Sequence, residues 1–280
     1  LADWKAFTLN HGPSWDVYID LYSGLPANVM GIGIDWVPDG MALPMEKLDT
    51  IGKEFISTYR NIFQAIDPSY LQINPSRSGY FGDDNYLTFI DFDVVYQGVP
   101  IKDAHIVFRC NHGRMVQFGT EGVLPENFTK LDPYPALSAE QAQFVAFDYA
   151  GGFDPKTDTL IEPGNLFFMP RILEQIPSKL GDHIDYPLVW EVSFKRAGEK
   201  GTWTAHVDAH SGQVLEFYDS NAYGSVKGGV YEVSQSESSE TLRPMPFADV
   251  QSGVYADSSG KYSIASGSIR TYLQGKYVKI

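Results

Sequence analysis

The spacing of hydrophobic and polar positions changes several times along the chain, and each change predicts an element. Hydrophobic and polar side chains alternate in residues 15–37, which is typical of strands, and Gly24-Leu25-Pro26 interrupts the alternation. After Pro44 the hydrophobic positions recur every three or four residues, so we expect a helix of about six turns that ends at Asp67-Pro68. Its buried face is predicted to consist of Leu48, Ile51, Phe55, Tyr59, Ile62, Phe63 and Ile66.

Strand patterns follow this helix. Residues 86–96 are rich in aromatic and β-branched side chains and predict one long strand. A turn at residues 97–100 leads into a second strand over residues 101–110. Asn111-His112-Gly113 then predicts a hairpin into residues 115–118. The proline-marked stretch 131–135 predicts a linker.

The same order of elements begins again after the linker. Ser138 and Gln141 have the spacing of a capping box, and Gly151-Gly152 closes the predicted helix. Gly212 turns the chain into a last strand, as Gly113 does in the first half, and each glycine is followed five residues later by a phenylalanine. We therefore predict a duplication, or two lobes of one fold. The strands of this second half are predicted over residues 165–170, 188–196, 201–209 and 213–217.

The composition shifts from Tyr223 onward to glycine- and serine-rich short strands. Residues 254–264 predict one hairpin around the turn 257–260, and residues 277–280 end the sequence in a strand pattern, so we expect the natural polypeptide to continue. The predicted fold class is α+β, with two cystatin-like lobes, each a long helix on an antiparallel sheet, followed by a small all-β sandwich-like domain. The predicted domain bounds are 1–131, 132–222 and 223–280.

Charge and composition exclude several classes of partner. The 280 residues carry a formal net charge of −14 without a cluster of Lys and Arg, which argues against nucleic acid. The surplus of negative charge is explained either by a solvated acidic surface or by an acidic face that docks on a basic partner. No apolar run is long enough to insert in a bilayer, and the first five residues lack the pattern of a signal peptide, so we expect any such segment to have been removed or never to have belonged to this sequence. Cys110 is the only cysteine, and its strand pattern predicts a small core residue rather than a nucleophile.

The candidate catalytic and metal-binding residues do not form a recognisable motif. His206 and His210 have the spacing of a zinc pair, but no Glu lies between them, and four residues along a strand separate side chains by roughly 13 Å. Asp91 and Asp93 share a strand face, which fits either a cation site or the wet side of a sheet. The acidic turns 83–85 and 257–260 lack the glutamate of a calcium loop. We predict no catalytic residue, no metal and no cofactor, and hence no enzymatic activity of the chain itself.

Two segments carry a family resemblance. Val95-Tyr96-Gln97-Gly98-Val99-Pro100-Ile101, followed by a His-Gly turn and residues 115–118, resembles the fungalysin/thermolysin propeptide domain. Residues 188–192, Trp203 and the run 207–215 are similar to the PepSY half of the same propeptides. The two matches come in the family's order over residues 45–220, whereas residues 1–40 depart from the family pattern. The tail, through residues 256–262, resembles the transthyretin-like sandwich of carboxypeptidase regulatory regions.

The resemblance implies a pro-region of a secreted zinc metalloendopeptidase, which inhibits the protease and assists its folding. Its partner would be the cognate catalytic domain, in an extracellular setting or after passage through a periplasm. The residues expected to contact the protease are Gln97, Gly98, Val99 and Pro100, although a tight turn that needs glycine explains them equally well. The alternative is a free-standing extracellular binding module for a cell surface, a glycan or a protein, in which exposed tryptophans would serve.

Overall fold

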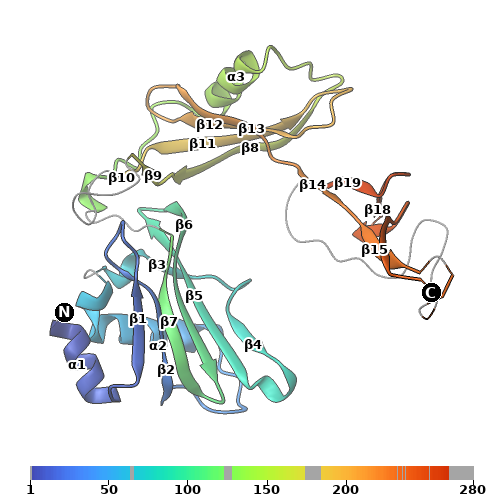
Figure 1. The fold of residues 1–280 in the computed structure, drawn as a ribbon. Coiled ribbons are helices and arrows are strands. Elements are labelled where there is room, and N and C mark those ends of the chain that lie inside the picture. Colours follow the sequence, from blue (N-terminus) through green and yellow to red (C-terminus); the bar gives the residue numbers. More distant parts are fainter. Residues whose placement is uncertain are drawn as a thin grey trace. The chain divides into compact units, whose positions relative to one another are not determined.

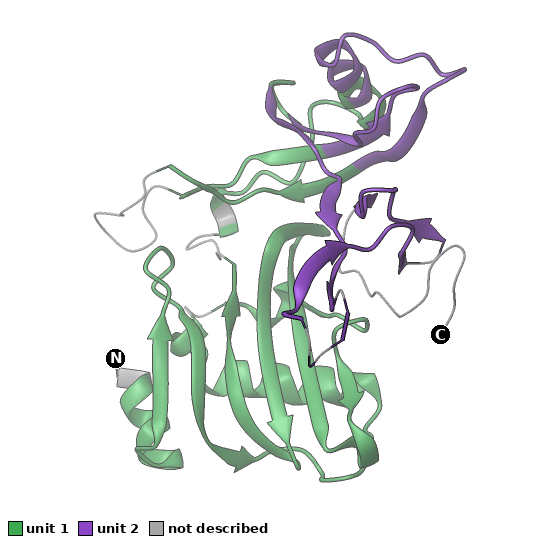
Figure 2. Ribbon diagram, turned by 45° about the vertical axis from the view of Figure 1, so that its right-hand side comes forward, with its two compact units in different colours: residues 1–142, 165–190, 208–213 green, residues 143–164, 191–207, 214–280 purple. Residues whose placement is uncertain are grey.

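The computed structural model describes residues 2–63, 66–122, 128–173, 184–231, 233–234, 236, 238–251 and 253–264. They form two compact units, each built from several stretches of chain (Figure 2). Unit 1 comprises residues 1–142, 165–190 and 208–213, and unit 2 comprises residues 143–164, 191–207 and 214–280. The three domain bounds expected from the sequence stay a prediction.

Unit 1 is built on an antiparallel sheet with its helices on one face (Figure 1). The strands lie in the order β1-β2-β7-β6, β5 pairs with the other side of β6, and both β3 and β4 pair with β5. The bounds are β1 Trp15–Ile19, β2 Pro26–Asp35, β3 Leu71–Ile73, β4 Gly79–Phe81, β5 Leu87–Tyr96, β6 Val99–Asn111 and β7 Arg114–Glu121. The long strand and the two hairpins predicted between residues 86 and 118 are therefore confirmed.

The predicted long helix is shorter than its periodicity indicated. Helix α2, Met45–Thr58, ends at Tyr59, and a 3-10 turn at Arg60–Phe63 carries the chain onward. The expectation of one helix up to Asp67 is wrong because the three- and four-residue spacing continues through the 3-10 turn, which keeps Ile62 and Phe63 buried. Helix α1, Ala2–His11, was not predicted. It places Phe7, which is fully buried, among the rings of the core.

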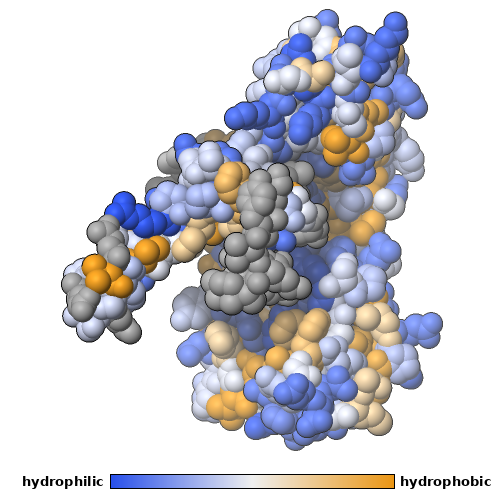
Figure 3. Space-filling model, turned by 90° about the vertical axis from the view of Figure 1, so that its right-hand side faces the viewer, coloured by the Kyte–Doolittle hydropathy of each residue, from blue (hydrophilic) through white to orange (hydrophobic). Residues whose placement is uncertain are grey.

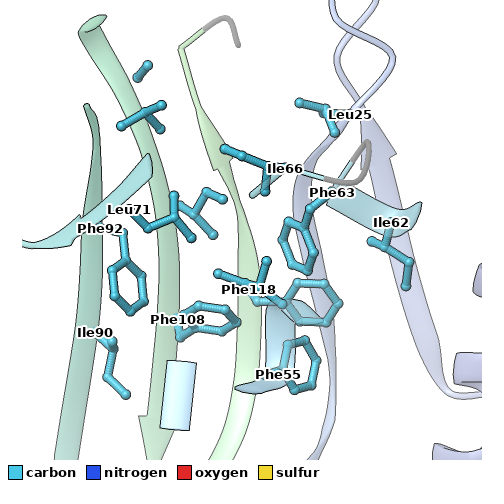
Figure 4. Close-up of a cluster of buried hydrophobic side chains, with 14 of the residues drawn as sticks. Leu25, Phe55, Ile62, Phe63, Ile66, Leu71, Ile90, Phe92, Phe108 and Phe118 are labelled. Atoms are coloured by element: carbon cyan, nitrogen blue, oxygen red, sulfur yellow. The ribbon is translucent and has the colours of Figure 1, made fainter. Parts of the chain in front are cut away.

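The core of unit 1 is aromatic. The ring centroid of Phe55 on α2 lies 5.5 Å from that of Phe108 on β6 and 5.3 Å from that of Phe118 on β7, and both pairs have the edge-on geometry that aromatic rings prefer. Figure 4 shows these three rings together in the cluster. Trp15 is also buried, and Trp4 and Trp36 pack against the cluster, so the tryptophans serve the core.

The second helix-and-sheet arrangement was predicted in outline. Helix α3, Ala139–Tyr149, begins with the predicted capping box: Ser138 N donates to Gln141 Oε1 at 2.8 Å, and Gln141 N donates to Ser138 Oγ at 3.3 Å. The strands follow the order β8-β11-β12-β13. Their bounds are β8 Thr159–Phe168, β11 Leu188–Lys195, β12 Trp203–Asp208 and β13 Val214–Asp219, while β9 Arg171–Ile172 and β10 Ile184–Asp185 form a separate pair.

The rest of unit 2 consists of short paired strands. Strand β14 Ala222–Ser225 pairs with β19 Lys261–Ile264, β15 Lys227–Val230 with β16 Thr241–Pro244, and β17 Asp249–Gln251 with β18 Val254–Tyr255. The hairpin predicted over residues 254–264 is therefore wrong in its pairing, although Gly260 N does close a turn on Asp257 O at 3.0 Å. Strand β19 pairs with β14, about forty residues earlier, and β18 pairs with the preceding β17, so the turn at residues 257–260 does not join the two strands of one hairpin. The strand expected at residues 277–280 lies outside the described residues.

The observed fold class is α+β, as predicted. In unit 2 the ring of Phe147 on α3 meets Phe194 of β11 edge-on at 5.2 Å, which joins the helix to one face of the strands. No described helix has the length and apolar character needed to cross a membrane. Hydrophobic residues are scattered in small groups among hydrophilic ones on the face shown in Figure 3.

Candidate functional site

The turn between β5 and β6 is the part of unit 1 that the sequence singled out. Tyr96 pairs with Val99, so Gln97 and Gly98 form a two-residue loop, with φ angles of 48° and 86°. Positive φ at both central positions is what a hairpin of this length requires, and glycine meets it without a steric penalty. Val99 is buried, whereas Gln97, Gly98 and Pro100 are exposed. Three of the four predicted contact residues are therefore accessible to a partner.

The base of this turn is anchored in the unit. The ring of Tyr96 lies 5.2 Å from Tyr70 and 5.8 Å from Phe128, and its hydroxyl oxygen accepts a hydrogen bond of 3.1 Å from Gln97 Nε2. Immediately after the turn, Ile101 of β6 pairs in parallel with Phe168 at the end of β8. The loop is therefore held at both of its ends.

The predicted linker is held in place by hydrogen bonds. We call residues 131–137 the strap. The backbone N–H groups of Ala136 and Leu137 both donate to Ala209 O at 2.9 Å, and Trp190 Nε1 donates to Leu137 O at 2.9 Å. The proline-rich composition indicated a connection but gave no sign of these bonds. The end of this segment is therefore fixed by hydrogen bonds to Ala209 and Trp190.

Tyr134, in the middle of this strap, contacts both the turn at Gln97-Gly98 and the turn that contains His210. Its hydroxyl donates to Gln97 Oε1 at 3.2 Å, and its carbonyl oxygen lies 3.1 Å from Nε2 of His210, which the carboxylate of Asp132 also approaches at 3.4 Å. The phenol ring remains 73% exposed. We call Gln97, Gly98, Asp132, Tyr134 and His210 the two-turn surface, and all five residues belong to unit 1.

Asp208 shapes the second turn of this surface. Its Oδ1 accepts hydrogen bonds from Ser211 N at 2.7 Å, from Ser211 Oγ at 2.8 Å and from His210 N at 3.1 Å. Partial burial acts to raise the pKa of Asp208, but these hydrogen bonds outweigh it and hold the pKa below its usual range. The carboxylate therefore stays ionised, and it fixes the turn before Gly212.

The two histidines with zinc-pair spacing lie in different surroundings. His206 belongs to unit 2 and is buried. Its Nε2 lies 2.9 Å from Glu191 Oε2, and its Nδ1 lies 2.9 Å from Glu216 Oε2. His210 belongs to unit 1, and its Nε2 contacts the carbonyl oxygen of Tyr134 in the strap. Each histidine is thus engaged by partners other than the one its spacing suggested. Within the part of the chain that the structure describes, no group of three His, Cys, Asp or Glu side chains could hold a metal ion.

Asp91 and Asp93 face the side of the sheet opposite α2, and both are paired with cationic or amide groups. Asp91 is buried, it accepts hydrogen bonds from the Arg109 guanidinium, and it forms an ion pair with Arg77, whose Nε lies 3.0 Å from Asp91 Oδ2. Asp93 accepts a hydrogen bond of 2.9 Å from Asn74 Nδ2 and lies 2.9 Å from His105 Nδ1. The two alternate aspartates of β5 are therefore part of a network of ion pairs and hydrogen bonds on this face of the sheet. His183 and its surroundings lie outside the described residues.

One family model matches the second half of the chain. Residues 136–218 match the family model described as PepSY, the peptidase propeptide and YPEB domain. No curated protein matches the chain.

Among solved structures, the chain resembles the Bacillus megaterium YpeB C-terminal domain. The identity is 12%, the TM-score is 0.32, and the match covers 78% of this chain and 96% of that one. The matched family segment begins in the strap and ends in β13, so it contains Trp190, His210 and the Asp208 turn. Residues 136–218 are thus similar to the PepSY family, whose description names a peptidase propeptide domain.

Proposed function

We propose that this chain is the pro-region of a secreted zinc metalloendopeptidase of the thermolysin or fungalysin type. It inhibits the protease and assists its folding until it is cleaved. The observation that carries the proposal is the match of residues 136–218 to the PepSY family, whose description names peptidase propeptides. The motif of residues 95–101, which resembles the propeptide domain of these proteases, supports it from the other half of the chain. In the same proposal the tail from residue 223 is a transthyretin-like β domain.

The role of a pro-region is supported on physical grounds. A protease that cleaves its own folding intermediates needs a cover for its cleft, and a tether on the same chain supplies that cover at a high effective concentration. The cover itself needs complementary shape and charge rather than catalytic groups. The formal net charge of −14 can contribute electrostatic attraction if the catalytic domain presents a basic rim.

The coding sequence gives the first test. The proposal expects the reading frame to continue beyond Ile280 into a catalytic domain with a His-Glu-x-x-His helix motif, the pair of histidines and the glutamate that such a zinc hydrolase uses. A stop codon directly after Ile280, or a membrane anchor without a protease, would instead favour a free-standing extracellular binding module.

The second test measures inhibition. Residues 1–280 are added in trans to the mature catalytic domain from the same reading frame, and cleavage of a fluorogenic peptide is followed. We expect stoichiometric inhibition and a higher yield when the unfolded catalytic domain is refolded with the chain present. A serine endopeptidase assayed in parallel controls for simple substrate competition. Unchanged cleavage together with an unchanged refolding yield would contradict the proposal.

A further inference from the structure

We infer that Tyr134 is the anchor of the contact between this chain and the catalytic domain, through the two-turn surface defined above. The inference rests on the proposed function and deepens it by naming the surface that touches the protease. The sequence predicted contacts with the protease only at the turn of residues 97–100. The structure adds to it an exposed tyrosine and a second turn that lies more than a hundred residues further along the chain.

The backbone of Tyr134 is fixed before any partner binds. Its N–H donates to Asp132 Oδ1 at 3.1 Å, and its carbonyl oxygen is engaged by His210. Two residues later the strap is bonded to Ala209. Pro133 and Pro135 on either side restrict the backbone further, because each fixes its own φ angle. Binding would therefore cost little backbone entropy at this position.

The side chain of Tyr134 is also restrained, although it is mostly exposed. The hydroxyl is bonded to Gln97 of the neighbouring turn, and the residue is 73% exposed. A rigid, amphipathic aromatic with few torsion angles to freeze is the type of residue that dominates binding energy at protein interfaces.

The groups bonded to Tyr134 indicate the kind of partner. The Gln97 amide accepts from the tyrosine hydroxyl, while the half-exposed imidazole of His210 and the exposed carboxylate of Asp132 contact its backbone. The two-turn surface therefore combines one exposed aromatic side chain with donors, acceptors and a negative charge. A protein surface with an apolar pocket for the ring and a basic or N–H donor group beside it would match this arrangement. We assign that pocket to the catalytic domain.

The test compares inhibition constants of matched variants against the same catalytic domain. Tyr134→Ala should weaken inhibition by about 10- to 30-fold, the loss typical of an anchor aromatic. Tyr134→Phe should weaken it by only about 2- to 5-fold, because it keeps the ring and loses one exposed hydrogen bond. Phe144→Ala is the matched control, since Phe144 is likewise 73% exposed but lies on α3, and it should leave inhibition unchanged.

Hydrogen exchange of the complex gives an independent readout and guards against a variant that fails to fold. Binding of the catalytic domain to the wild-type chain should slow amide exchange at residues 97–100 and 209–212 together. If the wild-type chain inhibits but Tyr134→Ala inhibits equally well, or if both turns exchange as fast in the complex as in the free chain, the inference is overturned and the proposed function stands. If the wild-type chain does not inhibit at all, the proposed function fails and the inference falls with it.

Discussion

Gly52 of α2 lies directly against Phe92 of β5: a β-carbon at Gly52 would be 2.5 Å from Cε2 of the phenyl ring. Phe92 is fully buried, so the ring cannot move aside without disturbing its neighbours. The helix can therefore approach the sheet this closely only where it carries no side chain.

Gly52→Ala should destabilise unit 1 in spite of the better helix propensity of alanine. Alanine in place of glycine favours the helix by about 1 kcal/mol. Overpacking a closed core costs about 1–3 kcal/mol, and the contact with Phe92 is at the severe end. We expect a net loss of about 1 kcal/mol in the free energy of unfolding, measured by urea denaturation. Ser57→Ala, on the exposed face of the same helix, is the control and should not lose stability.

Asp91→Asn should cost about 3 kcal/mol of unfolding free energy, because it leaves two guanidinium groups beside a buried amide. Asp35→Asn is the matched control: Asp35 is 94% exposed and pairs with Arg114 at 3.2 Å. Exposed pairs contribute little, so that variant should lose no more than about 0.5 kcal/mol. Equal losses in the two variants would show that the Asp91 network contributes no more than a surface pair.

His206→Asn should destabilise unit 2 by about 2 kcal/mol, because the shorter side chain cannot reach the carboxylates of Glu191 and Glu216 together. His112→Asn controls for the loss of an imidazole. His112 is exposed in a turn with φ 47°, a conformation that asparagine tolerates, and its stability should be nearly unchanged. Thermal melts followed by near-ultraviolet circular dichroism would measure both variants. An unchanged melt for His206→Asn would mean that the two contacts contribute nothing to unit 2.

Cys110 should resist alkylation in the folded chain. Burial raises the pKa of its thiol to about 12, while the positive charge of Arg109 lowers it by less. At pH 8 we expect iodoacetamide to modify Cys110 only after denaturant is added, as measured by intact mass. Rapid modification of the folded chain would contradict this burial.

The same shift predicts a pH dependence of stability. Above pH 9 the unfolded chain loses the thiol proton while the folded chain retains it, so the unfolded state binds fewer protons and stability falls as the pH rises from 9 towards 12. The slope should approach about 1.4 kcal/mol per pH unit from this group alone. Cys110→Ala removes the titrating group, so its unfolding free energy should fall less steeply over this range. Equal slopes would rule out the contribution of Cys110.

The sequence alone determined the elements whose signals are local. The capping box at Ser138, the glycine turns at Gly98 and Gly113 and the long aromatic strand before Gln97 all lie where they were predicted, because each depends on residues a few positions apart. Helix α2 ended early because the spacing that identifies a buried face does not distinguish an α-helix from a following 3-10 turn. In the tail, local turn chemistry located a turn and mistook the strand partners.

Only the tertiary structure decided which distant residues meet. Tyr134 was part of a predicted linker and His210 was a turn residue, and nothing in their sequence neighbourhoods indicates that both would lie beside Gln97. The spacing of Asp91 and Asp93 also fits a cation site. In the tertiary structure, however, Arg77 and Arg109 lie beside Asp91, and His105 lies beside Asp93. The physical reason is the same in each case. Hydrogen bonds and ion pairs between strands or turns depend on register and on sheet order, and these are set by the packing of the whole core rather than by any short run of residues.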